Sequence, residues 1–427
     1  MSIDAGRRRT LAGLAAGAVA SSALGRAAEA FLPGPQPGPK SASARPVVAV
    51  GRRARLVTAG GAIDPALLEQ ALGAAVARAA GEPTAVGAMR RLFKPTDVVG
   101  IKVNCLGGRG VSTRPEVALQ LAAFLPGPQP GPKSAPTRPV VAVGRRAGLV
   151  TAGGAIDPTL LEQALGAAVA RAAGEPTPLA AMRRLFKPTD VVGIKVNCLG
   201  GRGVSTRPEV ALQLAAFLQA AGVPADRIYV WDRTDRELRA AGYVLDRGHG
   251  VRVFGTNEDF DGRLIEWGPS ASRFDRVLST ELTALISCSV LKDHGLAGVS
   301  LTMKNWYGVV HNPNKLHDDN CAPFIPHLVA CPVIHDKLRL NVVDGALAQC
   351  HGGPARAPRW AWSYGGFLVS TDPVAVDAVG RQVLEARRRE VGLPPLAAEG
   401  REPGHIAGAA GLGLGTADLA RIERVEV

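Results

Sequence analysis

Apolar residues between positions 140 and 427 form short runs that alternate with longer segments of helical composition. Short continuous apolar runs are typical of strands that are buried on both faces. They predict strands at residues 140–143, 191–197, 227–232, 251–254, 284–291, 338–343, 367–370 and 422–427. This alternation predicts an α/β fold with a largely parallel or mixed sheet and helices on both of its faces.

Capping residues mark several helix starts. Asp157 followed by Pro158 predicts a helix through Ala173, because Asp can cap the first turn and Pro fits the first helical position. Thr206 and Glu209 have the spacing of a capping box and predict a second helix start. Two further helices are expected at residues 236–241 and 377–391.

The chain contains a tandem repeat, because residues 31–124 recur as residues 124–217 with an offset of 93. Such a close match indicates a recent duplication or an error in the source sequence. The second copy continues past Phe217 into a helix with a glycine stop, whereas Pro126 breaks the first copy. We therefore expect the second copy to belong to the folded domain. The copies differ at seven position pairs: Ser43/Pro136, Ala44/Thr137, Arg55/Gly148, Ala66/Thr159, Ala85/Pro178, Val86/Leu179 and Gly87/Ala180.

The first thirty residues have the pattern of an export signal. Arginines at positions 7–9 precede an apolar run from Leu11 to Leu24, and an A-x-A sequence ends the segment. The paired arginines favour the twin-arginine translocase and a periplasmic or other extracytoplasmic destination. The run is 14 residues long, shorter than the roughly 20 that span a bilayer. We expect no stable membrane span after cleavage.

Four segments follow from these observations. They are an export signal (1–30), a partial duplicate of the domain N-terminus (31–123), a Pro-rich linker (124–137) and an α/β domain (138–427).

The net charge of +13 is concentrated in the first two segments. Residues 31–123 hold twelve Lys/Arg and five Asp/Glu, and residues 1–30 hold four and two, which leaves +4 for residues 124–427. Few aromatic residues are interleaved with the basic ones, so we expect no nucleic-acid partner.

Lysine and asparagine side chains stand at the ends of predicted strands. Lys195 and Asn197 end one strand before a glycine-rich turn, Lys292 ends another, and Lys304 with Asn305 follows shortly after. Ligands of open α/β sheets bind at the carboxyl ends of strands, and convergent lysines can hold a carboxylate or phosphate. The pattern predicts a site for a small anionic molecule. The alternative is three lysines on separate surfaces and a turn that only reverses the chain.

Two further residues are candidates for catalysis. His294 follows Lys292 closely and could move protons near neutral pH. Asp344 precedes a glycine and could orient a ligand or bind a metal, or only form a turn. Together with Lys292, these residues define an enzyme hypothesis in which the anion is the substrate.

Histidines and cysteines gather between residues 294 and 351, where six of the eight histidines lie. Their side chains suit a divalent metal, with His311 and His317 as the favoured ligands. No pair has a compact zinc-binding spacing. The alternative function is therefore a metal-binding or iron–sulfur-type redox module without catalysis, and a scaffold protein without any site is the third.

Six short motifs stand out together, at residues 194–197, 206–209, 292–294, 304–308, 343–345 and 372–377. In these motifs the chain resembles the DUF362 family of uncharacterised proteins, and the resemblance spans residues 138–427. Many members of that family are labelled iron–sulfur proteins because they carry a ferredoxin-like cysteine run. This sequence lacks such a run, which counts against an iron–sulfur cluster. The resemblance supports the position of the site at the motif residues.

Overall fold

The computed structural model describes two separate parts of the chain. The first comprises residues 50, 52, 54–57, 62–93, 99, 101, 113 and 115–124, and the second is continuous over residues 138–427. The chain divides into compact units at residues 1–129 and 130–427, a division that falls within the predicted linker. The predicted export signal lies outside the described residues, and the predicted segment boundaries stay predictions.

The described part of the first unit holds three helices from the first repeat copy. They are α1 (Pro65–Ala80), α2 (Ala85–Leu92) and α3 (Pro115–Phe124). A small apolar cluster of Ala85, Met89 and Phe124 joins them. These helices correspond in sequence to α4, α5 and α6 of the second unit, described next.

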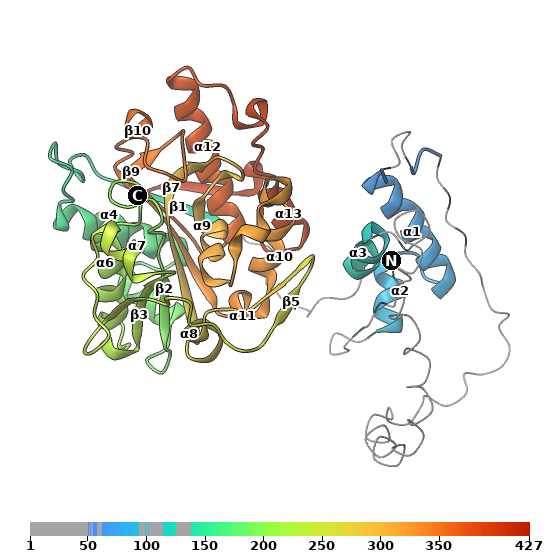
Figure 1. Ribbon diagram of the computed structural model, residues 1–427, viewed down its shortest axis with the longest axis horizontal. Coiled ribbons are helices and arrows are strands. Elements are labelled where there is room, and N and C mark those ends of the chain that lie inside the picture. Colours follow the sequence, from blue (N-terminus) through green and yellow to red (C-terminus); the bar gives the residue numbers. More distant parts are fainter. Residues whose placement is uncertain are drawn as a thin grey trace, which may run out of the picture. The chain divides into compact units, whose positions relative to one another are not determined.

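The second unit is a sheet with helices on both faces (Figure 1). Its strands are β1 (Val140–Arg145), β2 (Val192–Lys195), β3 (Ile228–Asp232), β4 (Arg252–Gly255), β5 (Ile265–Trp267), β6 (Ser270–Ser272), β7 (Ala284–His294), β8 (Gly298–Val299), β9 (Leu338–Gln349), β10 (Ala361–Trp362), β11 (Gly366–Ser370) and β12 (Glu423–Glu426). Its α-helices are α4 (Pro158–Ala173), α5 (Pro178–Leu185), α6 (Pro208–Ala220), α7 (Asp235–Ala241), α8 (Arg276–Thr280), α9 (Leu301–Lys304), α10 (Phe324–Ala330), α11 (Pro332–His335), α12 (Pro373–Glu390) and α13 (Gly404–Gly411).

Ten of these strands form one mixed sheet in the order β12-β1-β11-β9-β7-β2-β3-β4, with β8 and β10 paired at its margin. The block from β9 to β4 is parallel, whereas β11 runs antiparallel to both β1 and β9. The predicted α/β class with a mixed sheet is confirmed.

Alternate residues of the strands enter two hydrophobic cores. Val141 and Val143 face a core with α9, α10 and α12, whereas Ala142 faces a core with α4, α5 and α6. Figure 1 shows these two sets of helices on opposite sides of the sheet. Because both faces are covered, β7 is buried along its whole length, which explains the largely apolar composition of its first eight residues.

Most predicted elements are present, with differences at their ends. Asp157 caps α4 as predicted, since its carboxylate accepts a hydrogen bond from the Leu160 amide at 2.9 Å. The predicted capping box is wrong: α6 begins after Arg207 without a side-chain cap, and the Thr206 hydroxyl donates to the Cys288 carbonyl instead. The helix expected from residue 377 begins at Pro373, where Asp372 caps it.

The helices α1 and α4 show what the sheet contributes to a helix of nearly identical sequence. Both begin with the same Asp cap and end at a left-handed glycine. Three residues of α1 are buried, but nine of α4 are, because α4 packs against β1 and β11. None of the described helices is long and apolar enough to cross a membrane.

The paired caps generate a stability prediction with an internal control. Asp157→Ala removes the α4 cap and should lower the free energy of unfolding of the second unit by about 0.5–2 kcal/mol. Asp64→Ala removes the equivalent α1 cap and should leave that transition unchanged. All five tryptophans lie between residues 231 and 362, so tryptophan fluorescence during urea unfolding reports the second unit. Equal shifts in both variants would contradict the prediction.

Candidate functional site

A pocket of about 490 Å³ lies at the carboxyl ends of three adjacent parallel strands, β3, β2 and β7. The chain passes outward from β2 through β3 to β4 and then returns to β7 on the other side of β2. Such a reversal of strand order leaves a crevice where ligands of open α/β sheets bind. The predicted residues that line the pocket are Lys195, Asn197, Lys292, His294, Lys304, Asn305 and His317.

A buried ion pair joins the ends of β2 and β3. The Lys195 ammonium lies 2.6 Å from Asp232 Oδ1, and both side chains are almost fully buried. The other oxygen of Asp232 accepts a hydrogen bond from the Cys198 amide at 2.6 Å. Asn305 completes the junction by donating to the Lys195 carbonyl at 2.9 Å. Lys195 and Asp232 therefore neutralise each other inside the pocket wall.

Lys292 is held by neutral oxygens only. Its ammonium donates to Asn197 Oδ1 at 2.9 Å and to the Val204 carbonyl at 3.0 Å. Within residues 138–427, the one lysine ion pair is Lys195 with Asp232. Burial lowers the pKa of Lys292 to about 8, because removal from water disfavours the charged form.

Lys304 is the second buried lysine without a carboxylate partner among the described residues. Its nitrogen lies 3.8 Å from the centre of the Tyr307 ring and 3.3 Å from His317 Nε2. Burial lowers the pKa of Lys304 to about 8 as well. Two cations therefore lie in one pocket without protein counter-ions.

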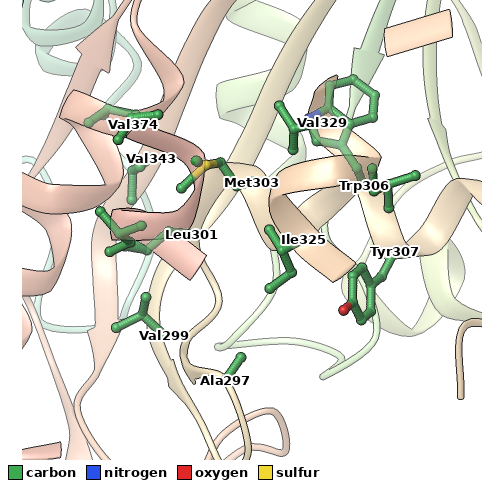
Figure 2. Packing of buried hydrophobic residues seen from close by; sticks show 14 of the residues in the cluster. Ala297, Val299, Leu301, Met303, Trp306, Tyr307, Ile325, Val329, Val343 and Val374 are labelled. Atoms are coloured by element: carbon green, nitrogen blue, oxygen red, sulfur yellow. The ribbon is translucent and has the colours of Figure 1, made fainter. Parts of the chain in front are cut away.

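An apolar layer positions the segment that carries Lys304 and Asn305. Figure 2 shows Leu301, Met303 and Trp306 packed with side chains from neighbouring elements, among them Ile325 of α10 and Val374 of α12. These three side chains are fully buried. The polar residues of the same turn are left to face the pocket, where both Lys304 and Asn305 lie.

Leu301 begins α9 in a left-handed conformation, with φ of 44°, which is costly for a residue with a Cβ. Its side chain fits only because Gly380 of α12 lies opposite: a Cβ there would stand 2.9 Å from Leu301 Cδ1. Asp377, one turn earlier on α12, accepts hydrogen bonds from the Thr302 and Met303 amides. The long helix thus holds the short helix in place from below the pocket.

His294 is a neutral hydrogen-bond donor in this geometry. Its Nδ1 accepts the backbone amides of Leu296 and Ala297 at 3.1 and 3.2 Å. A neutral ring with Nδ1 as acceptor carries its proton on Nε2. Burial, with the charge of Lys304 as the next cause, lowers the pKa of His294 to about 2. The ring therefore stays neutral at physiological pH.

The two predicted metal ligands lie in different surroundings. His317 lines the pocket and stacks on His294 with ring centroids 6.1 Å apart. His311 is exposed, packs edge-on against Phe260 and is absent from the pocket lining. Among the residues that the structure describes, no group of three or more His, Cys, Asp or Glu side chains is placed to hold a metal. The metal site at His311 and His317 stays a prediction.

Asp344 is buried away from the pocket lining. Its carboxylate accepts the Arg207 amide at 3.0 Å, at the start of α6, and the Ala346 amide at 2.9 Å. Burial raises the pKa of Asp344 to about 6. With these contacts Asp344 stabilises a turn and the start of α6, which matches the turn that the sequence analysis offered as the alternative to ligand or metal binding.

Two amides of the glycine-rich turn after β2 are bonded within the protein. The Gly201 amide donates to the Cys198 carbonyl and the Arg202 amide donates to the Ala240 carbonyl, at 3.1 Å each. Gly201 and Gly203 adopt positive φ, as a tight reversal requires. The turn therefore serves chain reversal, and the lysine side chains are the donors in the pocket.

Sequence reasoning missed several pocket residues. Tyr307, Arg233, Glu237 and Asp232 line the pocket but were not predicted as site residues. Asp232 ends an apolar strand, and this position could have been used to predict an ion pair with Lys195 at the end of the neighbouring strand. The spacing of Lys304 and Tyr307, three residues apart, would have indicated their contact if a helical turn had been predicted there.

These features define an α/β protein with a buried, lysine-lined pocket at the carboxyl ends of its parallel strands. Residues 192–382 match a family model described as Domain of unknown function (DUF362). The match covers β2 to α12, includes all the pocket lysines and supports the family resemblance. Comparison with curated proteins and with solved structures found no match.

Gly308 provides a test of how tightly the pocket wall is packed. A Cβ at this position would lie 2.8 Å from the Lys195 nitrogen and 3.1 Å from Asp232 Oδ1. Gly308→Ala should therefore lower the free energy of unfolding by about 1–3 kcal/mol. Gly262→Ala is the control, because nothing lies within 4 Å of its added Cβ. Urea unfolding compares the two, and equal stability would show that the pair tolerates displacement.

Proposed function

We propose that the protein binds a small anionic molecule in the pocket between β2 and β7. The observation that supports this most strongly is the pair of buried ammonium groups, Lys292 and Lys304, that have no carboxylate partner among the described residues. An isolated buried charge is costly unless a counter-ion accompanies it. A bound anion would supply that counter-ion.

The charges that line the pocket support the same proposal. Its two carboxylates are already engaged, Asp232 with Lys195 and Glu237 with Arg233. The remaining cations, Lys292 and Lys304, suit a ligand with up to two negative charges. His294 Nε2–H adds a neutral donor at the pocket wall, which can bind an oxygen atom without requiring further charge.

Replacing either unpaired lysine should weaken anion binding without harming the fold. Lys292→Met and Lys304→Met should each reduce the affinity for inorganic sulfate roughly 10- to 100-fold, because a charged hydrogen bond contributes about 1.5–3 kcal/mol. Isothermal titration calorimetry measures this on the full chain. Lys337→Met is the control: Lys337 is also partly buried but bonds to the Leu278 carbonyl outside the pocket. A similar loss in the control would contradict the site.

The pH dependence of sulfate binding gives an independent check. Lys292 and Lys304 have pKa values of about 8, and sulfate keeps its charge across this range. Binding should be strongest below about pH 8 and decline as the pH rises through that value, since the lysines then lose their protons. Affinity that stays constant to about pH 10 would overturn the proposal.

We also propose that the chain is exported through the twin-arginine translocase to the periplasm. The arginines at positions 7–9 and the apolar run that follows support this. Replacing Arg7 and Arg8 by Lys should retain the protein in the cytoplasm, as cell fractionation and immunoblotting would show. Unchanged periplasmic recovery would remove the proposal.

A further inference from the structure

The three pocket lysines differ in how their nitrogen atoms are held. Lys195 lies 2.6 Å from a carboxylate oxygen, and Lys292 donates to two carbonyl oxygens at 2.9 and 3.0 Å. Among the described residues, the partners of the Lys304 nitrogen are the face of Tyr307 and one ring nitrogen of His317 at 3.3 Å. Of the three lysines, Lys304 therefore has the weakest hydrogen bonds at its nitrogen.

The orientation of His317 determines what Lys304 meets. Nδ1 of His317 lies 3.1 Å from the Pro313 carbonyl and 3.3 Å from the Asn314 carbonyl. Carbonyl oxygens only accept, so Nδ1 carries the proton and Nε2 presents a lone pair to Lys304. The Lys304 nitrogen, 3.3 Å away, therefore meets a neutral acceptor rather than a carboxylate, so no negative charge stabilises its protonated form there.

Other groups in the pocket complement the Lys304 nitrogen. His294 stacks on His317 and offers an Nε2–H donor, and Lys292 offers a fixed positive charge. A neutral donor suits a carbonyl oxygen, and a fixed cation suits a carboxylate. The combination matches a molecule that carries a carbonyl group beside a carboxylate.

We propose that Lys304 forms a Schiff base with the carbonyl group of a 2-oxo acid whose carboxylate is bound by Lys292. This inference rests on the proposed anion-binding function, because it names the class of anion. Lysine amines in apolar surroundings are effective nucleophiles toward carbonyl groups. Lys304 has such surroundings, because its side chain is buried and its nitrogen lies against the face of the Tyr307 ring.

The reaction balances without any further reactant. The Lys304 ammonium group loses one proton to water, and the neutral nitrogen attacks the carbonyl carbon while the C=O electron pair moves to oxygen. His294 Nε2–H stabilises that oxygen by a hydrogen bond. The oxygen then takes up two protons, one from the attacking nitrogen and one returned by water, and leaves as water. The product is a C=N bond between lysine and substrate.

Reductive trapping tests the proposal on the full-length protein. Incubation with pyruvate and sodium borohydride should add one reduced pyruvate per chain, located at Lys304 by peptide mass spectrometry. Inorganic sulfate should suppress the adduct, because it competes for Lys292. An adduct at Lys292, or one spread over exposed lysines such as Lys315, would overturn the proposal, as would no adduct at all.

Two variants, one in the pocket and one outside it, test whether the adduct depends on Lys304. Lys304→Arg keeps the charge but cannot form an imine, so the adduct should be lost. Lys337→Arg changes a partly buried lysine outside the pocket and should retain the adduct. Peptide mapping of the unmodified sequence decides the outcome even if Lys304→Arg fails to fold.

Sulfate binding measured in parallel separates this inference from the proposed function. Lysine-dependent sulfate binding without trapping at Lys304 would refute the Schiff base and leave the anion site standing. Trapping at Lys304 without any sulfate binding would refute the anion site as described and support the reactive lysine alone.

Discussion

The pocket depends on the buried ion pair between Lys195 and Asp232. It joins the carboxyl ends of two parallel strands, and each partner also binds backbone groups: Asp232 accepts the Cys198 and Arg233 amides, and Lys195 donates to the Val196 carbonyl. Removing one partner of such a pair would leave an uncompensated buried charge, which is strongly destabilising. Because Asp232 is fully engaged, it cannot also neutralise Lys292 or Lys304. The charge balance of the whole site follows from this one contact.

Local sequence predicted the α/β class and the positions of most strands, because strands buried on both faces are continuously apolar. It also placed Lys195 and Lys292 at strand ends, and parallel strands bring such ends to one edge of the sheet. The cap at Asp157 could be predicted because it involves a contact within a few residues.

The remaining features depend on contacts between distant segments. Thr206 has the spacing of a capping box, but the neighbouring strand β7 offers its hydroxyl a closer acceptor at Cys288, 2.8 Å away. Asp344 was a candidate for catalysis. In the structure the start of α6 lies beside it, and the Arg207 amide donates a hydrogen bond to its carboxylate. Neither outcome could follow from spacing alone, since strand order decides which groups meet.

The edge of the sheet at β1 has a consequence for how the chain folds. β1 pairs in parallel with β12, and the Val143 carbonyl accepts a hydrogen bond from the Val427 amide. Arg146 reinforces this pairing through a bond to a carbonyl 281 residues later in the chain. During synthesis, β1 therefore emerges long before the strand that covers its outer edge, and unpaired strand edges can recruit other chains. Contacts of such long range also slow folding, so the nascent protein would benefit from a chaperone that shields β1 until β12 is made.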